Sequence, residues 1–432
     1  MKKIVLSIAG VMAAAAFAPE ASAVPSFARQ TGMACNACHQ QHYPVLNGFG
    51  QAFKAAGYTM MGAQEKVEGE HLSIPNVLNA SMLLKARYVT DDSAGAPAGT
   101  GQSTTGNGQW QIPDEFSLFF GGRVAENIGF MFEGNTAASA LVAGFKMPFV
   151  FDMGSVKLLA IPYLTDALGA SYGFEQASTG AVRGVRWAEH RGDISAQQYV
   201  GTDGAATGVA LVVSGDMGYI NFSKWTPAAN LANPGGGGGT NNLASNYIRI
   251  AATPTMGDWA MHIGAQVWSG GDVAIALTRA KALDFQAQGQ AAGKDLSVYA
   301  TWAKVDATNT VTADAVAAAF PAGSAPASWG AVANKSAWTI GADYSIIPHV
   351  LHIGAAYRNG DDGAVLTAGN IAAGRGNNDD SVTLTAVYDL TQNVALHVNH
   401  SERSGNRYNP AAVGGAARTG KSLTTFLLEA AW

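Results

Sequence analysis

Apolar and polar residues alternate with a period of two along most of residues 76–432, and this alternation predicts one β-strand after another. The most regular stretches are 78–88, 259–267, 351–358 and 394–399. In the first stretch, Leu83 is the one apolar residue on the otherwise polar face. When such strands cross a membrane as a closed barrel, the apolar face meets lipid and the polar face lines the lumen.

The connections between these strands are of two lengths. Short turns are predicted at 125–129, 214–218, 255–258, 347–349 and 389–393. Long polar stretches rich in glycine are predicted at 90–108, 226–242 and 359–380. Short turns on one side and long loops on the other are typical of outer-membrane barrels, and the 357 residues from 76 to 432 suit about 16 antiparallel strands. Segment 164–173 is ambiguous between strand and loop.

The composition agrees with an all-β transmembrane barrel. Hydrophobic residues make up 48% of the chain and charged residues 13%, whereas a soluble domain carries about 25% charged residues. The chain holds 52 glycines, and beyond its N-terminal stretch it has no apolar run long enough for a membrane-spanning helix. A large secreted β-sandwich or β-helix is the alternative. The net charge of −5 argues against nucleic acid as a partner.

Both ends of the sequence indicate export. Residues 1–23 read as a signal peptide, with two lysines, an apolar stretch at 4–17 and a small-residue cleavage site at 21–23. The short apolar run and the cleavage site favour a signal peptide over a membrane anchor. One face of the last predicted strand carries Phe426, Leu428, Ala430 and Trp432. A last strand with an aromatic final residue resembles the C-terminal signal of bacterial outer-membrane proteins, so we expect the protein in the outer membrane of a Gram-negative bacterium.

Residues 24–75 are expected to form a small α-helical domain that sits in the lumen of the barrel or at its periplasmic mouth. The apolar residues of a short helix recur there at Leu46, Phe49, Phe53 and Ala56. Asn47 is placed to cap this helix and Gly57 to end it. A segment of about 50 residues makes a poor core alone, so we expect a covalent cofactor or a surrounding barrel to stabilise it.

The two cysteines of the chain stand in the sequence Cys35-Asn36-Ala37-Cys38-His39, which is the attachment signature of a c-type haem. Each thiol forms a thioether with a haem vinyl group, and His39 is expected to be the proximal ligand of the iron. A thioredoxin-like redox pair or a disulfide is the alternative, but the following histidine, the export signal and the lack of a βαβ pattern argue for haem. We expect one covalent haem c.

The second axial ligand is left open by the sequence. Met60, Met61 and His71 lie far enough along the chain to wrap around a haem held by Cys35 and Cys38. His42 is too close to His39 to reach the opposite face. An open position or another ligand is the remaining alternative. A methionine ligand would raise the reduction potential relative to histidine.

Two further groups of residues are candidates for metal chemistry. The first is formed by the histidines predicted to face the lumen, His262, His352 and His397. They would form a metal or electron path, or they simply suit a polar lumen. The second consists of acidic residues in the long loops, Asp91, Asp92, Asp361, Asp362, Asp379 and Asp380. Carboxylates attract divalent cations, so these residues would gather a cationic substrate at the outer mouth, or they are solvated loop charges.

The N-terminal part closely resembles the fused outer-membrane cytochrome–porin family of iron-oxidising bacteria. The resemblance covers about 50 residues: PSFARQTGMACNACH at 25–39, followed by YPVL at 43–46, Phe49-Gly50, Phe53-Lys54 and Gly57-Tyr58. It implies a monohaem cytochrome c at 24–75 joined to an outer-membrane porin at 76–432. It also implies oxidation of extracellular Fe(II), with the electron passed through the barrel to a periplasmic carrier such as a soluble cytochrome.

Two other functions fit the same features. One is a diffusion porin in which the haem domain is a structural or gating plug. The other is an electron conduit for a different extracellular donor or acceptor.

Overall fold

The computed structural model describes residues 26–40, 45–62, 64–92, 106, 108–135, 142–180, 188–226, 243–270, 279–306, 334–361, 379–405 and 420–432. The expected signal peptide, His42, Asp362 and most of the long loops lie outside these residues. Among the described residues, no helix is long and apolar enough to cross a lipid bilayer.

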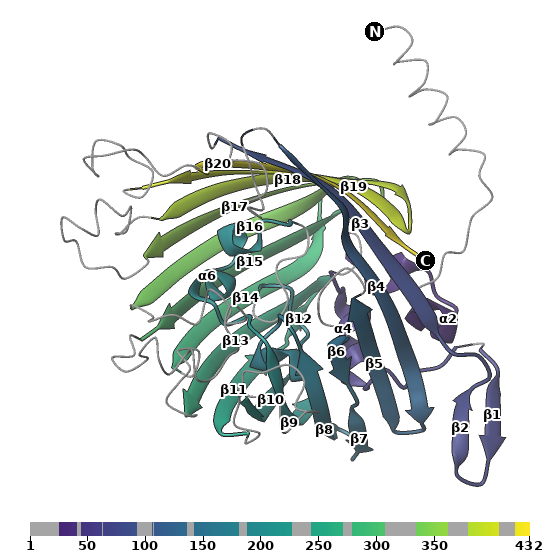
Figure 1. Cartoon of the computed structure of the whole chain (residues 1–432). Helices are drawn as coiled ribbons and strands as arrows, with labels where there is room; N and C mark the ends of the chain where they lie inside the picture. Colours follow the sequence, from purple (N-terminus) through teal and green to yellow (C-terminus); the bar gives the residue numbers. More distant parts are fainter. Residues whose placement is uncertain are drawn as a thin grey trace, which may run out of the picture.

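The dominant element is a closed antiparallel barrel (Figure 1). Its strands are β3 (Ala80–Asp91), β4 (Gln109–Ala125), β5 (Ile128–Asn135), β6 (Val142–Lys146), β7 (Phe149–Asp152), β8 (Val156–Thr165), β9 (Ala206–Gly215), β10 (Gly218–Thr226), β11 (Ser245–Ala252), β12 (Thr255–Met256), β13 (Trp259–Gly270), β14 (Ala280–Ala291), β15 (Lys294–Val305), β16 (Lys335–Ile347), β17 (Leu351–Asp361), β18 (Asp380–Thr391), β19 (Val394–Ser404) and β20 (Ser422–Ala431). The pairs β6/β7 and β11/β12 each form one interrupted strand, so the wall has sixteen strands as the sequence predicted. The barrel closes where β20 pairs with β3, and this closure rules out the β-sandwich and the β-helix.

The alternation along the strands divides the wall into an outer and an inner face. On β14, Leu283 is 55% exposed whereas its neighbour Asp284 is 4% exposed. All four regular stretches of the sequence show this order, with apolar residues outside and polar residues inside. The aromatic face of the last strand also points outward. An apolar outer band with a polar interior is the pattern of a membrane-spanning barrel, so the protein is placed in the outer membrane.

The short turns lie at one end of the barrel and the long connections at the other. Both the start of β3 and the end of the chain lie at the turn end, where the backbone N–H of Met82 donates to the Trp432 carbonyl over 2.8 Å. The ambiguous segment 164–173 is strand only up to Thr165 and then becomes the 3-10 helix η1 (Ala170–Gly173). In outer-membrane barrels the short turns face the periplasm and the long loops face outward.

The N-terminal segment forms three short helices and a hairpin. The helices are α2 (Ser26–Thr31), α3 (Cys35–Cys38) and α4 (Gly48–Ala55), and the hairpin pairs β1 (Lys66–Gly69) with β2 (Leu72–Pro75). Figure 1 shows α4 among the strands of the barrel and the hairpin projecting from it. The structure thus does not establish the helical cytochrome domain expected from the sequence: the segment forms only three short helices, which pack both on one another and on the barrel wall.

Three aromatic rings of this segment, those of Phe27, Phe53 and Tyr58, pack together beside the barrel wall. Phe27 stacks on Tyr58 with centroids 4.9 Å apart, and Phe53 contacts Phe27 edge-on at 5.1 Å. On the wall, Gly121 leaves room for the Phe27 ring, since a Cβ there would lie 2.8 Å from it. Aromatic pairs of this kind contribute about 0.5–1.5 kcal/mol beyond the area they bury.

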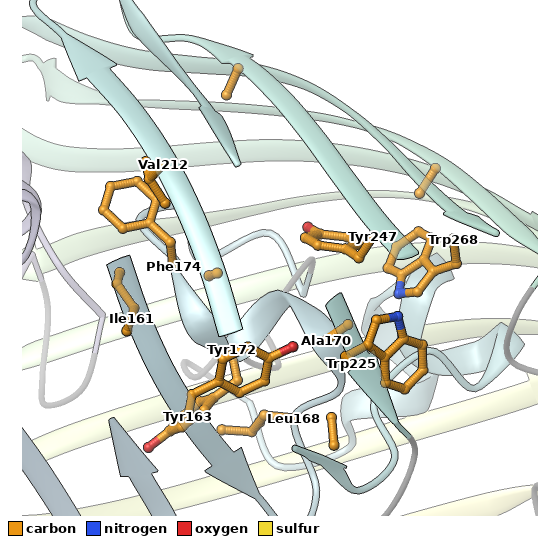
Figure 2. Packing of buried hydrophobic residues seen from close by; sticks show 14 of the residues in the cluster. Ile161, Tyr163, Leu168, Ala170, Tyr172, Phe174, Val212, Trp225, Tyr247 and Trp268 are labelled. Carbon is orange, nitrogen blue, oxygen red and sulfur yellow. The ribbon is translucent and has the colours of Figure 1, made fainter. Parts of the chain in front are cut away.

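The connection between β8 and β9 folds into the lumen. It contains η1 and two helices, α5 (Arg191–Ile194) and α6 (Ala196–Val200). Figure 2 shows Tyr172 of this connection beside Tyr163 of the wall and Phe174 beside Val212, and all four belong to one buried cluster with Tyr247 and Trp268. The Phe174 and Tyr219 rings meet edge-on at 4.9 Å. The lumen is therefore occupied by protein from both ends of the barrel.

A substitution on the outer face tests the assignment of lipid-facing positions. We expect Leu283→Arg to lower the free energy of unfolding by about 2–4 kcal/mol, because it places a charge in the hydrocarbon layer. Ile347→Arg, at the turn-end edge of the band, should cost only about 0–1 kcal/mol. Urea unfolding in lipid vesicles measures both, and equal effects of the two variants would contradict the assignment.

Candidate functional site

The haem motif forms a single helical turn at the turn end of the barrel. The backbone N–H of His39, the residue that follows α3, donates to the Cys35 carbonyl over 3.0 Å, and both cysteines and His39 line one cavity. Asn47 ties this turn to α4: its side-chain oxygen accepts from the Gly50 N–H at 3.0 Å, and its side-chain nitrogen donates to the Ala37 carbonyl at 3.0 Å. The predicted cap at Asn47 and the predicted stop at Gly57, with φ of 68°, are both confirmed.

The imidazole of His39 is oriented by the backbone. Its Nδ1 lies 3.3 Å from the Val45 carbonyl oxygen. When Nδ1 donates to a carbonyl, the lone pair is on Nε2, which is the tautomer that metal-binding histidines use. The local geometry therefore suits the predicted role of His39 as an iron ligand.

The surroundings of the two thiols do not suit a thioredoxin-like redox pair. Cys35 and Cys38 are both half-buried and form no disulfide. Burial raises the pKa of the Cys35 thiol, to which the nearby Asp389 adds, and burial raises the pKa of the Cys38 thiol. A reactive thioredoxin-like cysteine needs the opposite shift, towards a lower pKa.

A cavity of about 160 Å³ opens beside the motif, between the N-terminal segment and the barrel wall. Its N-terminal side includes Phe27, Met33, Cys35, Cys38, His39, Leu46, Phe53 and Tyr58, and its barrel side includes Met82, Leu83, Phe119, Phe120, Met131 and Ala431. Apolar side chains with two thiols and an imidazole at one edge fit a porphyrin that is bound covalently at that edge. Leu83, the exception to the polar face in the sequence, points into the lumen, where it is 3% exposed and lines this cavity.

Polar contacts hold α4 to the far side of the wall. Gln51 donates to Gln288 on β14 over 3.2 Å, and its oxygen lies 2.7 Å from Nε2 of His262 on β13. Lys54 forms a 2.7 Å ion pair with Glu175, a residue of the lumen connection that also lines the cavity. The sequence alone gave no signal for Gln51, Lys54 or Glu175 as partners, because each contact joins residues more than a hundred positions apart.

The candidates for the second axial ligand do not gather at this cavity. Met60 is 37% exposed, and its carbonyl accepts from the Gln30 side chain at 2.7 Å. His71 lies in the β1–β2 hairpin with its side chain 92% exposed. Neither residue lines the cavity, nor does Met61. Their role therefore stays a prediction without structural support.

The three predicted lumen histidines do face inward, but they do not meet. His262, His352 and His397 are each at most 3% exposed and belong to β13, β17 and β19. His352 lies 3.6 Å from Asp343, and His262 contacts Gln51 as described. In the part of the chain that the structure describes, no group of three or more histidine, cysteine or acidic side chains is arranged to hold a metal ion.

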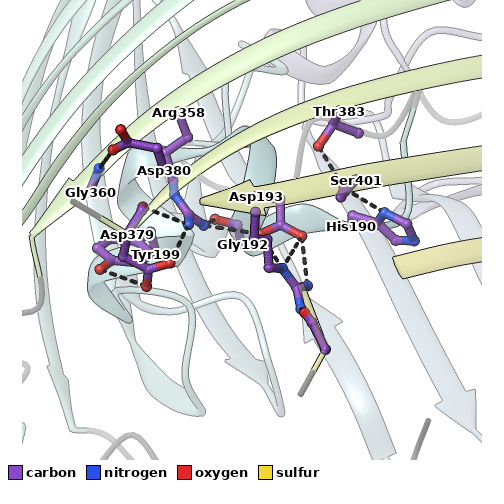
Figure 3. A network of polar contacts seen from close by, with 12 residues as sticks. His190, Gly192, Asp193, Tyr199, Arg358, Gly360, Asp379, Asp380, Thr383 and Ser401 are labelled. Carbon is purple, nitrogen blue, oxygen red and sulfur yellow. Dashed lines mark hydrogen bonds and ion pairs between the residues drawn. The ribbon is translucent and has the colours of Figure 1, made fainter. Parts of the chain in front are cut away.

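The acidic residues at the loop end are paired rather than open to cations. Asp379 is 2% exposed and lies 3.2 Å from Arg358, and its carboxylate also accepts from Tyr199 at 3.1 Å (Figure 3). Asp380 accepts from the Asn359 amide at 2.7 Å. Asp361 ends β17. The proposed attraction of cations at the outer mouth gains no support from Asp379, since its charge is compensated.

Near this end, α5 and α6 are anchored to the wall by Asp193 and His190. The Asp193 carboxylate lies 2.7 Å from Arg403 and 3.2 Å from Arg358. Burial alone would raise the pKa of Asp193, but hydrogen bonds and charge from Arg403, with Arg358, hold it below its usual value. His190 lies between Ser401 at 2.7 Å and Thr425 at 2.8 Å, and burial lowers its pKa to about 4.

In comparisons with known proteins, the fold of this chain resembles that of porins. The chain matches no protein-family model and no curated protein sequence. Solved structures that it resembles include a mutant porin of Rhodopseudomonas blastica, at 10% identity, covering 82% of this chain and 99% of that one with a TM-score of 0.45. The outer-membrane protein OmpT of Vibrio cholerae resembles it at 10% identity, covering 85% and 99% with a TM-score of 0.44. OmpF of Salmonella typhi, in a complex with daunomycin, does so at 12% identity, covering 85% and 100% with a TM-score of 0.45. No activity carries over at this level of similarity.

Two glycines of α4 test the contact between this helix and the haem motif. A Cβ at Gly50 would overlap the carbonyl oxygen of Cys38, whereas a Cβ at Gly48 would meet Ala260 at an ordinary 3.6 Å. We therefore expect Gly50→Ala to separate α4 from the motif and to lower several-fold the yield of the covalent haem predicted from the sequence, while Gly48→Ala leaves that yield unchanged. Haem stain of denaturing gels, normalised to protein, measures the yield. Equal yields would show that the contact is dispensable.

The anchoring of α5 and α6 should weaken in acid. The pKa of docked His190 is depressed to about 4, below the usual value of about 6.5. Neutral His190 therefore contributes about 3 kcal/mol to docking above about pH 6.5, and this contribution is lost progressively as the pH falls towards and below 4. The depressed pKa of Asp193 acts in the same direction. Hydrogen exchange at the Ala196 amide, which donates to Thr301 over 3.1 Å, reports the docking. Exchange there, compared at each pH with the non-titrating His190→Gln variant, should rise more steeply in the natural chain between pH 6.5 and 4; parallel profiles would contradict this account.

Proposed function

We propose that this protein is an outer-membrane electron conduit that carries one covalent haem c at the periplasmic end of its barrel. The observation that carries the proposal is the position of the haem motif: Cys35, Cys38 and His39 share one cavity with the barrel wall. A lipid bilayer excludes charge and unpaired backbone groups, so a cofactor that serves both sides needs a closed protein wall around it. The barrel supplies this wall.

The chain's own residues hold and shield the proposed cofactor. Each thiol of Cys35 and Cys38 would add across one vinyl double bond of the porphyrin, forming a carbon–sulfur bond and placing the hydrogen on the neighbouring carbon. His39 would hold the iron through Nε2 while Nδ1 remains on the Val45 carbonyl. Phe27, Phe53 and Leu83 exclude water. When bound, the haem supplies reversible one-electron chemistry at its iron.

We propose extracellular Fe(II) as the electron donor and a soluble periplasmic cytochrome as the acceptor. The support for Fe(II) is the resemblance of residues 25–58 to cytochrome–porins of iron-oxidising bacteria. A chemical argument adds to it: Fe(III) precipitates near neutral pH, so oxidation outside the periplasm keeps the solid product outside as well. When bound, the haem would accept the single electron that Fe(II) loses on becoming Fe(III).

A diffusion porin with a haem plug is the second candidate function. Its support is the barrel itself, a closed wall of sixteen strands with a polar interior. Against free diffusion stands the N-terminal segment, which reaches the Arg123 backbone through Gln30 at 3.1 Å and, across the lumen, Gln288 through Gln51. A segment fixed to two separate parts of the wall obstructs the passage at this end.

Absorption spectra of the purified protein before and after anaerobic addition of Fe(II) test the proposal. We expect a haem spectrum that changes from ferric to ferrous, and no haem in the Cys35→Ser/Cys38→Ser variant. A haem that stays oxidised under excess Fe(II) but is reduced by dithionite would contradict Fe(II) as donor and favour another donor or acceptor.

Swelling of liposomes in small sugars separates the second candidate. Rapid swelling together with a haem that Fe(II) does not reduce would favour the porin with a plug. No swelling together with rapid reduction is the result expected for the conduit.

A further inference from the structure

The cavity beside the haem motif contains a thioether from the barrel wall. Besides Cys35, Cys38 and His39, the side chains lining it that carry a nitrogen, oxygen or sulfur atom include three methionines, Met33, Met82 and Met131, together with hydroxyl, amide, lysine and glutamate side chains. Iron of a c-type haem takes histidine or methionine most readily as its second protein ligand. Only the three methionines of this set, Met33, Met82 and Met131, meet that requirement among the described residues.

Met131 is the methionine whose strand directs it into the cavity. It lies on β5 opposite Gly121 of β4, and both residues are buried on the inner face of the wall. Met131 is 8% exposed and belongs to the buried cluster that also contains Phe53 and Tyr58. Gly121, which has no side chain, leaves this part of the wall open to the Phe27 ring. The thioether is thus presented to the cavity from the barrel, whereas His39 enters from the N-terminal segment.

The other two methionines are less well placed. Met33 is 40% exposed and is separated from Cys35 by one residue, on the same short segment as His39. Met82 stands between Ser81 and Leu83, two residues of β3 that face the lumen. Because side chains alternate along a strand, Met82 points outward. An iron held by His39 on one face needs its second ligand from another part of the cavity lining, and of the three methionines Met131 alone is a buried residue of the inner wall.

We infer that Met131 of the barrel wall is the second axial ligand of the haem iron. The inference rests on the proposed attachment of haem to Cys35 and Cys38 and goes beyond it. It makes the barrel part of the redox centre, since β5 then supplies half of the protein coordination of the iron. It also explains how the N-terminal segment is held in register with the wall: a bond between iron and sulfur closes the cavity between them.

Spectroscopy of single variants tests this assignment. The natural protein should show, in its ferric form, the weak absorption band at the red edge of the spectrum that marks a sulfur–iron bond. Met131→Leu should abolish this band, convert the ferric haem from low spin to high spin and shift the midpoint potential to lower values. Met33→Leu, Met82→Leu and Met61→Leu should each retain the band and the low-spin state.

A second variant keeps the test decisive if Met131→Leu folds poorly. Met131→His should restore a low-spin haem without the sulfur band and with a potential below that of the natural protein. A natural protein without the band, or a Met131→Leu variant that retains it, would overturn the inference. Covalent haem measured by intact mass distinguishes the two proposals: a protein without haem refutes the attachment, whereas haem present with an unaltered Met131→Leu spectrum refutes only the ligand.

Discussion

The closure of the barrel, with β20 paired to β3, is the constraint on which the rest of the structure depends. Backbone groups in lipid have no water to bind, so every strand must be paired and no edge can remain. An even number of antiparallel strands then brings the start of β3 and the end of β20 to the same end of the barrel. The segment before β3 therefore begins at the turn end. Its apolar residues, with Phe27, Phe53 and Tyr58 foremost, find a place there only against the inner wall, because the outer wall belongs to lipid.

The polar interior explains how this segment and the lumen connection are held. Glu175 connects three parts of the molecule, with Lys54 of α4 at 2.7 Å and Lys146 of β6 at 3.4 Å. Deeper in the wall, Arg249 and Asp284 form a two-point ion pair at 2.6 and 2.8 Å. Buried charges are costly unless they are paired and hydrogen-bonded, so these contacts define where each element docks more than they add to stability. Specific docking is what a cofactor site shared between two segments requires.

A lumen that chain segments enter from both ends suits the passage of electrons better than the passage of solutes. Diffusion needs a continuous aqueous path, whereas an electron needs only closely spaced groups in a fixed arrangement. The N-terminal segment at one end and α5 and α6 at the other both occupy the interior, and both are tied to the wall by several side chains. The proposed haem would lie where the first of these meets the wall, within reach of a periplasmic partner and separated from lipid by the strands.

The sequence by itself determined the barrel, because a period of two with an apolar face is a local property that lipid enforces on each strand alone. The inward histidines, the cap at Asn47 and the roles expected of Cys35, Cys38 and His39 also follow from neighbouring residues. What only the tertiary structure decided are the contacts between distant positions: Lys54 with Glu175, Gln51 with His262, Asp379 with Arg358, and Met131 beside the haem motif. Met60, Met61 and His71 were plausible ligands by distance along the chain, but the ligand set of a shared cavity depends on which wall faces it. That choice is made by strand register and barrel closure, which no local pattern contains.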